Sequence, residues 1–165
     1  MRFAAFRHHT AREGFEVVFL GDRRYEGHSV GVEDGRPYAV RYAIEVDERR
    51  HTRRARIGAL ALESDGEGHW RVDGDPDPRF DGCLDVDLEA SAFTNAFPVA
   101  REATDAPAVY VRAFDASLLR LEQRYERTGE RTWHYVCERF DADLVLTFAE
   151  DGIVADYPGL ATRVR

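Results

Sequence analysis

The chain has 165 residues, of which 44% are apolar and 33% charged, and its 31 acidic and 23 basic side chains give a formal net charge of −8. This length and composition predict one folded domain over residues 1–165 and exclude a disordered chain. The negative charge argues against nucleic acid or an anionic membrane surface as a partner, because both attract positively charged proteins.

The chain has no apolar segment of membrane-spanning length. Its longest uncharged stretch, residues 91–100, is far shorter than the ~20 apolar residues that cross a bilayer. Arg7, His8 and His9 interrupt the N-terminus where an export signal needs a continuous apolar run. We therefore expect a cytoplasmic protein without a stable membrane anchor, in which Cys83 and Cys137 are reduced, buried thiols.

Alternating apolar and polar residues predict β-strands through the first half of the chain. Residues 15–20 form one such run. In residues 37–47 the pattern indicates a half-buried strand, with one face made by Tyr38, Val40, Tyr42, Ile44 and Val46. Alternation continues over residues 52–63 after a charged turn. Further strands are expected at residues 69–72 and 82–88, where Asp85 and Asp87 lie opposite Val86 and Leu88.

The second half of the chain continues the pattern after one irregular segment. Residues 90–102 have no clear period and predict a short helix or an ordered loop. Strands are expected at residues 108–115, 118–128, 132–139, 142–148 and 153–157. The fold class is therefore mainly β: a single curled antiparallel sheet, a spiral β-roll or barrel-like, with at most one or two short helices. A curled sheet of this size often encloses a pocket.

Asp85 and Asp87 are the most suggestive acidic pair. Residues i and i+2 of a strand project from one face about 7 Å apart, which suits two carboxylates that share a hard cation or divide acid and base roles. The pair would then serve an enzyme acting on a carbohydrate or lipid ester. The alternative is a solvated face, or an inward face neutralised by a partner such as Arg112 or Arg124.

Other polar clusters favour structural roles. The only basic cluster comprises Arg49, Arg50, His51, Arg53, Arg54 and Arg56. It suits an anionic head group, but an exposed turn balanced by Asp47 and Glu48 is the preferred interpretation. We expect His8 and His9 to form a frayed terminal pair. The chain has no Lys for a Schiff base, and we expect neither a cofactor nor a metal.

Residues 81–98 carry a family resemblance. The run DGCLDVDL at residues 81–88, followed by Phe93-Thr94-Asn95 and Pro98, resembles the signature of the putative glycolipid-binding protein family. Later stretches agree, at residues 123–125, around Tyr135, and at residues 140–145 and 151–160. One position departs from the family pattern, because Arg50 stands where a Trp is expected.

The resemblance implies a spiral β-roll whose concave apolar face holds a hydrophobic or glycolipid small molecule without catalysis. A polar group would hold the sugar or head group, and aromatic side chains would hold the tails. The candidate ligand-binding residues are Asp85, Asp87, Phe93, Thr94, Asn95, Arg124, Tyr125, Tyr135 and Tyr157. Three alternatives stay open: the polar group is only a structural corner, the acidic pair is catalytic, or a sheet edge or dimer face binds a protein. The oligomeric state is not predicted.

Overall fold

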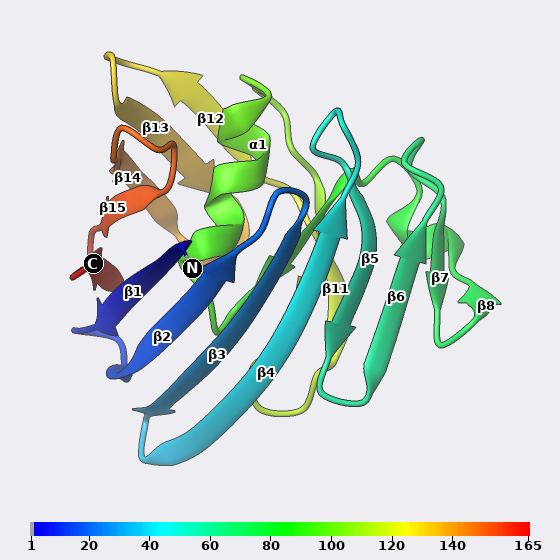
Figure 1. Ribbon diagram of the computed structural model, residues 1–165, viewed down its shortest axis with the longest axis horizontal. Helices are drawn as coiled ribbons and strands as arrows, with labels where there is room; N and C mark the ends of the chain where they lie inside the picture. Colours follow the sequence, from blue (N-terminus) through cyan, green and yellow to red (C-terminus); the bar gives the residue numbers. More distant parts are fainter. Residues whose placement is uncertain (1) are drawn as a thin grey trace.

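The computed structural model describes residues 2–165, which form a long curled antiparallel sheet of thirteen strands (Figure 1). The first eight strands are β1 (Arg2–His8), β2 (Glu13–Leu20), β3 (Arg24–Glu33), β4 (Arg36–Val46), β5 (Thr52–Ile57), β6 (Leu60–Ser64), β7 (Trp70–Val72) and β8 (Asp75–Pro76). The last five are β12 (Arg124–Arg127), β13 (Thr132–Cys137), β14 (Ala142–Phe148), β15 (Val154–Tyr157) and β16 (Ala161–Arg163). Neighbours in the sheet are neighbours in the chain, apart from one pairing.

That pairing joins the first strand to the last. β1 lies antiparallel to β16, with Phe6 opposite Arg163 and His8 opposite Ala161. The sheet therefore runs from β12 through β16, across this seam to β1, and on to β8. Both ends of the chain lie beside the middle of the sheet, while β12 and β8 form its outer ends (Figure 1).

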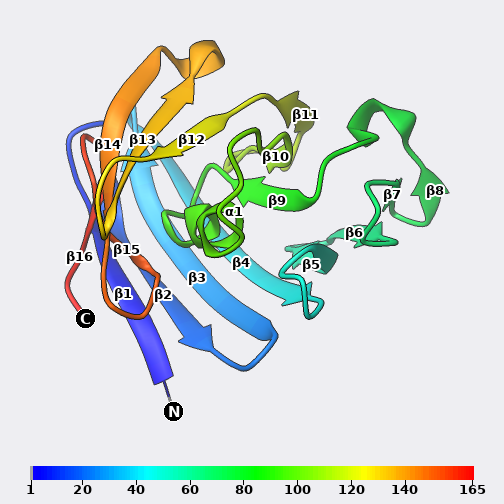
Figure 2. The same cartoon turned by 90° about the horizontal axis from the view of Figure 1, so that it is seen from above.

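The segment between β8 and β12 lies on the concave side of the sheet (Figure 2). We call residues 85–111 the inner segment. It contains β9 (Asp85–Leu88), the 3-10 helix η2 (Phe93–Asn95), α1 (Ala96–Ala100) and β10 (Ala108–Val111). β9 pairs in parallel with β10, which pairs antiparallel with β11 (Leu118–Leu121). Two more 3-10 helices are η1 (Pro78–Phe80) and η3 (Glu138–Phe140).

The inner segment fills much of the hollow that the curled sheet makes. Every residue of β9 and β10 is buried, so these two strands have no solvent-facing side. The concave face is therefore not the open apolar surface that the sequence suggested. This face packs against the inner segment, because burial there removes the apolar side chains of that segment from water.

Strand β4 buries its apolar side chains by alternation. Tyr38, Tyr42, Ile44 and Val46 of β4 are buried, which confirms the half-buried strand expected there. Tyr42 lies directly across from Gly27 of β3, and a Cβ at that glycine would come within 2.1 Å of the tyrosine ring. Glycine thus makes room for the ring on the concave face.

The fold class is confirmed: the protein is mainly β, with one large antiparallel sheet and one short α-helix. The sheet is curled but not closed. Two of the predicted strands are wrong, because each is divided into two strands in the structure. Residues 52–63 form the hairpin β5–β6, which turns at Gly58 with a φ of 58°. Residues 118–128 divide into β11 and β12, which belong to different sheets.

The terminal histidines are not frayed, which corrects the expectation for this pair. His8 is buried in β1, and its Nδ1 lies 2.9 Å from the Tyr38 hydroxyl. His9 Nε2 lies 2.9 Å from the Thr162 hydroxyl of β16. The N-terminal strand is paired on both sides, with β2 and β16, so these two histidines lie against the sheet rather than at a free end.

Candidate functional site

Asp85, at the start of β9, is neutralised by an arginine. Two nitrogens of Arg101 meet its two carboxylate oxygens at 2.7 and 2.5 Å, and the Asp85 side chain is 2% exposed. Burial raises the pKa of Asp85, although the guanidinium acts against that shift. The same arginine donates to the carbonyl oxygens of Arg50 and Phe97. Asp85 therefore fastens the inner segment.

Asp87 has a different environment on the same strand. Its Oδ1 accepts a hydrogen bond of 2.6 Å from the Thr94 hydroxyl. Within residues 2–165 no arginine, lysine or histidine forms an ion pair with it. Burial raises the pKa of Asp87 to about 6, against the hydrogen bond from Thr94. The two aspartates therefore differ in their partners: Asp85 is paired with an arginine, whereas Asp87 is held by a hydroxyl group alone.

Tyrosine side chains connect the inner segment to β12 and β13. The Tyr125 hydroxyl donates to Asn95 Oδ1 at 2.8 Å, and the Tyr135 hydroxyl donates to Gln123 Oε1 at 3.1 Å. Ring centroids lie 5.0 Å apart for Tyr125 and Tyr135, and 5.9 Å apart for Tyr135 and Tyr157. These three rings form a continuous aromatic row beside the inner segment.

A cavity of about 330 Å³ opens beside this row. We call it the tyrosine pocket. Its aromatic and polar lining includes Tyr110, Tyr135, Tyr157, Arg12, Glu33, Asp87 and Asn95. Phe140, Leu144 and Leu160 add apolar surface. A concave site with aromatic walls and a few polar groups is the usual form of a small-molecule site.

The tyrosine pocket brings together four of the nine predicted ligand-binding residues: Asp87, Asn95, Tyr135 and Tyr157. Thr94 and Tyr125 are buried and hold Asp87 and Asn95 in place, whereas the buried Asp85 binds Arg101, which does not line the pocket. Phe93 lines another recess with Tyr25 and Arg50. Arg124 is exposed on β12, where it pairs with Asp105 at 3.2 Å. The nine residues therefore do not form one site.

Sequence reasoning missed three charged residues of the tyrosine pocket, Arg12, Glu33 and Glu89. Arg12 is 6% exposed, its Nη2 lies 3.4 Å from Glu33 Oε2, and its Nη1 donates to the carbonyl oxygen of Glu89. Arg12 Nε and Glu33 Oε2 are buried without a hydrogen-bond partner. No sequence signal marks this pair, because it joins the β1–β2 turn to the far end of β3.

Glu16 is a further buried acid that the sequence analysis did not single out. It accepts hydrogen bonds from the Tyr42 and Ser91 hydroxyls at 2.6 and 2.5 Å, and from the Ala92 amide at 3.0 Å. Burial raises its pKa to about 7, despite these hydrogen bonds. A glutamate within the apolar run of residues 15–20 is the signal that could have revealed it.

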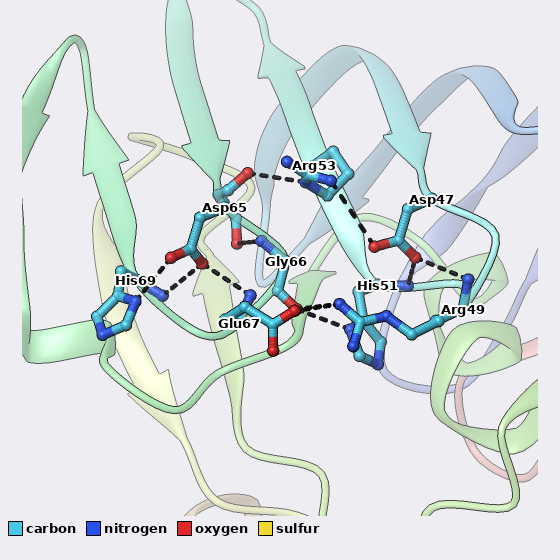
Figure 3. Close-up of polar contacts among 9 residues, drawn as sticks. Asp47, Arg49, His51, Arg53, Asp65, Gly66, Glu67 and His69 are labelled. Atoms are coloured by element: carbon cyan, nitrogen blue, oxygen red, sulfur yellow. Dashed lines mark hydrogen bonds and ion pairs between the residues drawn. The ribbon is translucent and has the colours of Figure 1, made fainter.

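The basic cluster lies only partly in a turn: Arg53, Arg54 and Arg56 belong to β5, and Glu48 pairs with Arg23 rather than with the cluster. Figure 3 shows Asp47 accepting hydrogen bonds from the backbone amides of Arg49 and His51, at 2.9 and 3.0 Å. His51 Nδ1 contacts the Gly66 carbonyl oxygen at 2.8 Å, and Arg53 Nε donates to the Ser64 carbonyl oxygen at 3.0 Å (Figure 3). These hydrogen bonds of the cluster join the turn after β4 to the turn after β6.

Cys83 and Cys137 are both buried free thiols. Burial raises the pKa of Cys83 to about 11, so it is protonated near neutral pH. Within residues 2–165, no helix is long and apolar enough to cross a bilayer. In the same range, His, Cys, Asp and Glu side chains do not gather in a group of three or more that would suit a metal ion.

The fold and the pocket can be compared with known proteins. The family described as "Putative glycolipid-binding" matches residues 6–163. The chain belongs to the putative glycolipid-binding family. This confirms the resemblance found around residues 81–98. A crystal structure of a DUF1089 family protein from Pseudomonas aeruginosa is similar to this family member, with a TM-score of 0.82 and 32% sequence identity over 92% of each chain. No curated protein matches the chain.

Proposed function

We propose that this family member is a non-catalytic binding domain for a glycolipid, and that the tyrosine pocket holds the sugar head group. Three tyrosine rings and the polar groups of Asp87 and Asn95 meet around one cavity, and this observation carries the proposal. Aromatic rings supply apolar faces, while buried polar groups fix the orientation of a ligand. The family description agrees with such a ligand.

The apolar part of the pocket lining suits the first carbons of a lipid tail. Phe140 is 42% exposed and packs against Tyr110 in a tilted arrangement, with ring centroids 5.1 Å apart. Leu144 and Leu160 line the same cavity. A cavity of about 330 Å³ matches a head group better than a whole acyl chain, so we propose that most of the tail stays outside it. We place this single domain, residues 1–165, in the cytoplasm without a nucleic-acid partner.

Extraction and titration test this function. Organic extracts of the purified protein are analysed by mass spectrometry, and octyl glucoside is titrated calorimetrically below its micelle concentration. Leu144→Trp places a large ring in the pocket, and we expect it to weaken binding at least tenfold, which corresponds to about 1.4 kcal/mol.

Val145→Trp is the matched control. Val145 follows Leu144 on β14, but it points to the opposite face and is 45% exposed. It should bind octyl glucoside as the parent protein does. Equal binding by the two tryptophan variants would contradict a head-group site in this pocket, as would a parent protein that binds no glycoside.

A further inference from the structure

We propose that the tyrosine pocket selects an uncharged, hydroxyl-bearing head group and rejects head groups that carry phosphate, sulfate or carboxylate. This inference rests on the proposed function and adds the chemical class of the ligand. It depends on the charges around the cavity and on the hydrogen bonds that a ligand can offer to Asp87.

Three of the four charged groups that line the pocket already have counter-ions. Arg12 pairs with Glu33 at 3.4 Å. Glu89 also lines the pocket, and it pairs with Arg112 at 3.2 Å while accepting a hydrogen bond of 2.7 Å from the Ala113 amide. The guanidinium of Arg12 is thus already engaged, and an incoming anion finds no free cation in this lining.

Asp87 is the fourth charged group, and it has no counter-ion within residues 2–165. Its negative charge reaches the tyrosine hydroxyls: burial is the main cause that raises the pKa values of Tyr110 and Tyr157, and Asp87 raises both further. The pKa of Asp87 is about 6, so the group is mostly ionised at neutral pH. A phosphate in the pocket would face this carboxylate directly.

The hydrogen-bonding capacity of a hydroxyl group leads to the same ligand class. A hydroxyl group can both donate and accept, so a sugar can donate a hydrogen bond to the Asp87 carboxylate, which lines the pocket. A fully ionised phosphate or sulfate only accepts, so it would meet the Asp87 carboxylate as a like charge and offer it no donor.

Two amphiphiles with the same tail test the inference. Octyl glucoside and octyl phosphate are titrated into the parent protein at about pH 7.5, where Asp87 is mostly ionised. We expect octyl phosphate to bind at least tenfold more weakly. Phosphate binding that equals or exceeds glucoside binding, and that Leu144→Trp abolishes, would overturn the selectivity while leaving the head-group site intact. Failure of both probes would overturn the selectivity together with the proposed function.

Asp87→Asn identifies the group responsible for the selectivity. Removal of this charge should weaken octyl glucoside binding and strengthen octyl phosphate binding, so that the ratio between the two falls at least tenfold. Asp143→Asn removes one charge from an exposed position of β14, and it controls for the change in net charge. An equal change of the ratio in both variants would contradict a role for Asp87. The comparison on the parent protein requires neither variant.

Discussion

Arg101 and Asp85 form a nearly buried ion pair whose side chains are 12% and 2% exposed. Removing one partner leaves an uncompensated charge in the interior, which costs about 3–5 kcal/mol. We therefore expect Arg101→Ala to lower the free energy of unfolding by that amount, measured by urea denaturation. Arg24→Ala is the control, because it breaks the exposed pair with Glu45 and should cost less than about 1 kcal/mol. Equal losses in the two variants would show that Asp85 does not fasten the inner segment.

Glu16 makes the stability of the protein depend on pH. Its pKa is about 7 in the folded protein and 4.5 in the reference state, so the folded state binds its proton more tightly. The resulting stabilisation is complete below the lower value and is lost as the pH rises through the higher one, an effect on the order of 3 kcal/mol.

Glu16→Gln cannot titrate, so its free energy of unfolding should fall less than that of the parent between about pH 5 and pH 8. Urea denaturation at the two pH values measures the difference. The glutamine also loses the hydrogen bond from the Ala92 amide, so the pH dependence is the decisive quantity rather than the absolute stability. Parallel pH profiles would contradict the role of Glu16.

The sequence singled out Asp85 and Asp87 but could not separate their roles. Both residues occupy the same face of one strand, and they differ only in the side chains that they contact. The expected partners were Arg112 and Arg124, which instead pair with Glu89 and Asp105. Asp85 meets Arg101, which follows α1 at the end of a segment without periodicity. Alternation predicts which face a residue occupies, but not which distant side chain lies there.

At the scale of the elements, Gly27 of β3 determines how closely Tyr42 packs. A Cβ there would meet ring atoms of Tyr42 at 2.1 to 2.5 Å, and this ring is 1% exposed and has little space to move. We expect Gly27→Ala to lower the free energy of unfolding by about 1–3 kcal/mol through overpacking. His28→Ala, at the next and exposed position, should change it by less than about 0.5 kcal/mol. Thermal and urea denaturation of both variants measure these effects.

The sequence predicted the strands that have one solvent-exposed face and one buried face. It missed β3 because small and polar residues occupy part of its buried face, so apolar alternation is weak: Gly27 and Ser29 follow Tyr25 there. It read β9 as half-buried because Asp85 and Asp87 alternate with Val86 and Leu88. Both faces of β9 are buried, and hydrogen bonds rather than solvent satisfy its carboxylates.

At the scale of the molecule, the β1–β16 seam holds the two halves of the sheet together. Removal of residues 159–165 would expose the edges of β1 and β15 in the middle of the sheet. Unpaired edges promote aggregation. We expect the shortened protein to lose its cooperative thermal transition and to self-associate in size-exclusion chromatography. Pro76→Ala, in β8 at the outer end of the sheet, should leave both properties unchanged.

The number of predicted strands was enough to predict a curled sheet. It was not enough to predict that the inner segment fills the concave side of that sheet. An open apolar hollow and a filled one require the same inward pattern, so periodicity cannot distinguish them. The burial of the inner segment is visible only in the folded structure, in which Val86, Val109 and Leu88 are at most 2% exposed. The polar pocket that remains depends on contacts between β3, β9, β13 and the β1–β2 turn, which no local pattern connects.

The seam also sets an order of events during protein synthesis. β16 is synthesised after the fifteen strands that precede it, so the edge of β1 stays without its partner until residues 161–163 have been translated. At about 5–20 residues per second, this delay lasts roughly 8 to 30 seconds. During this time β1 keeps an unpaired edge, and unpaired edges favour aggregation.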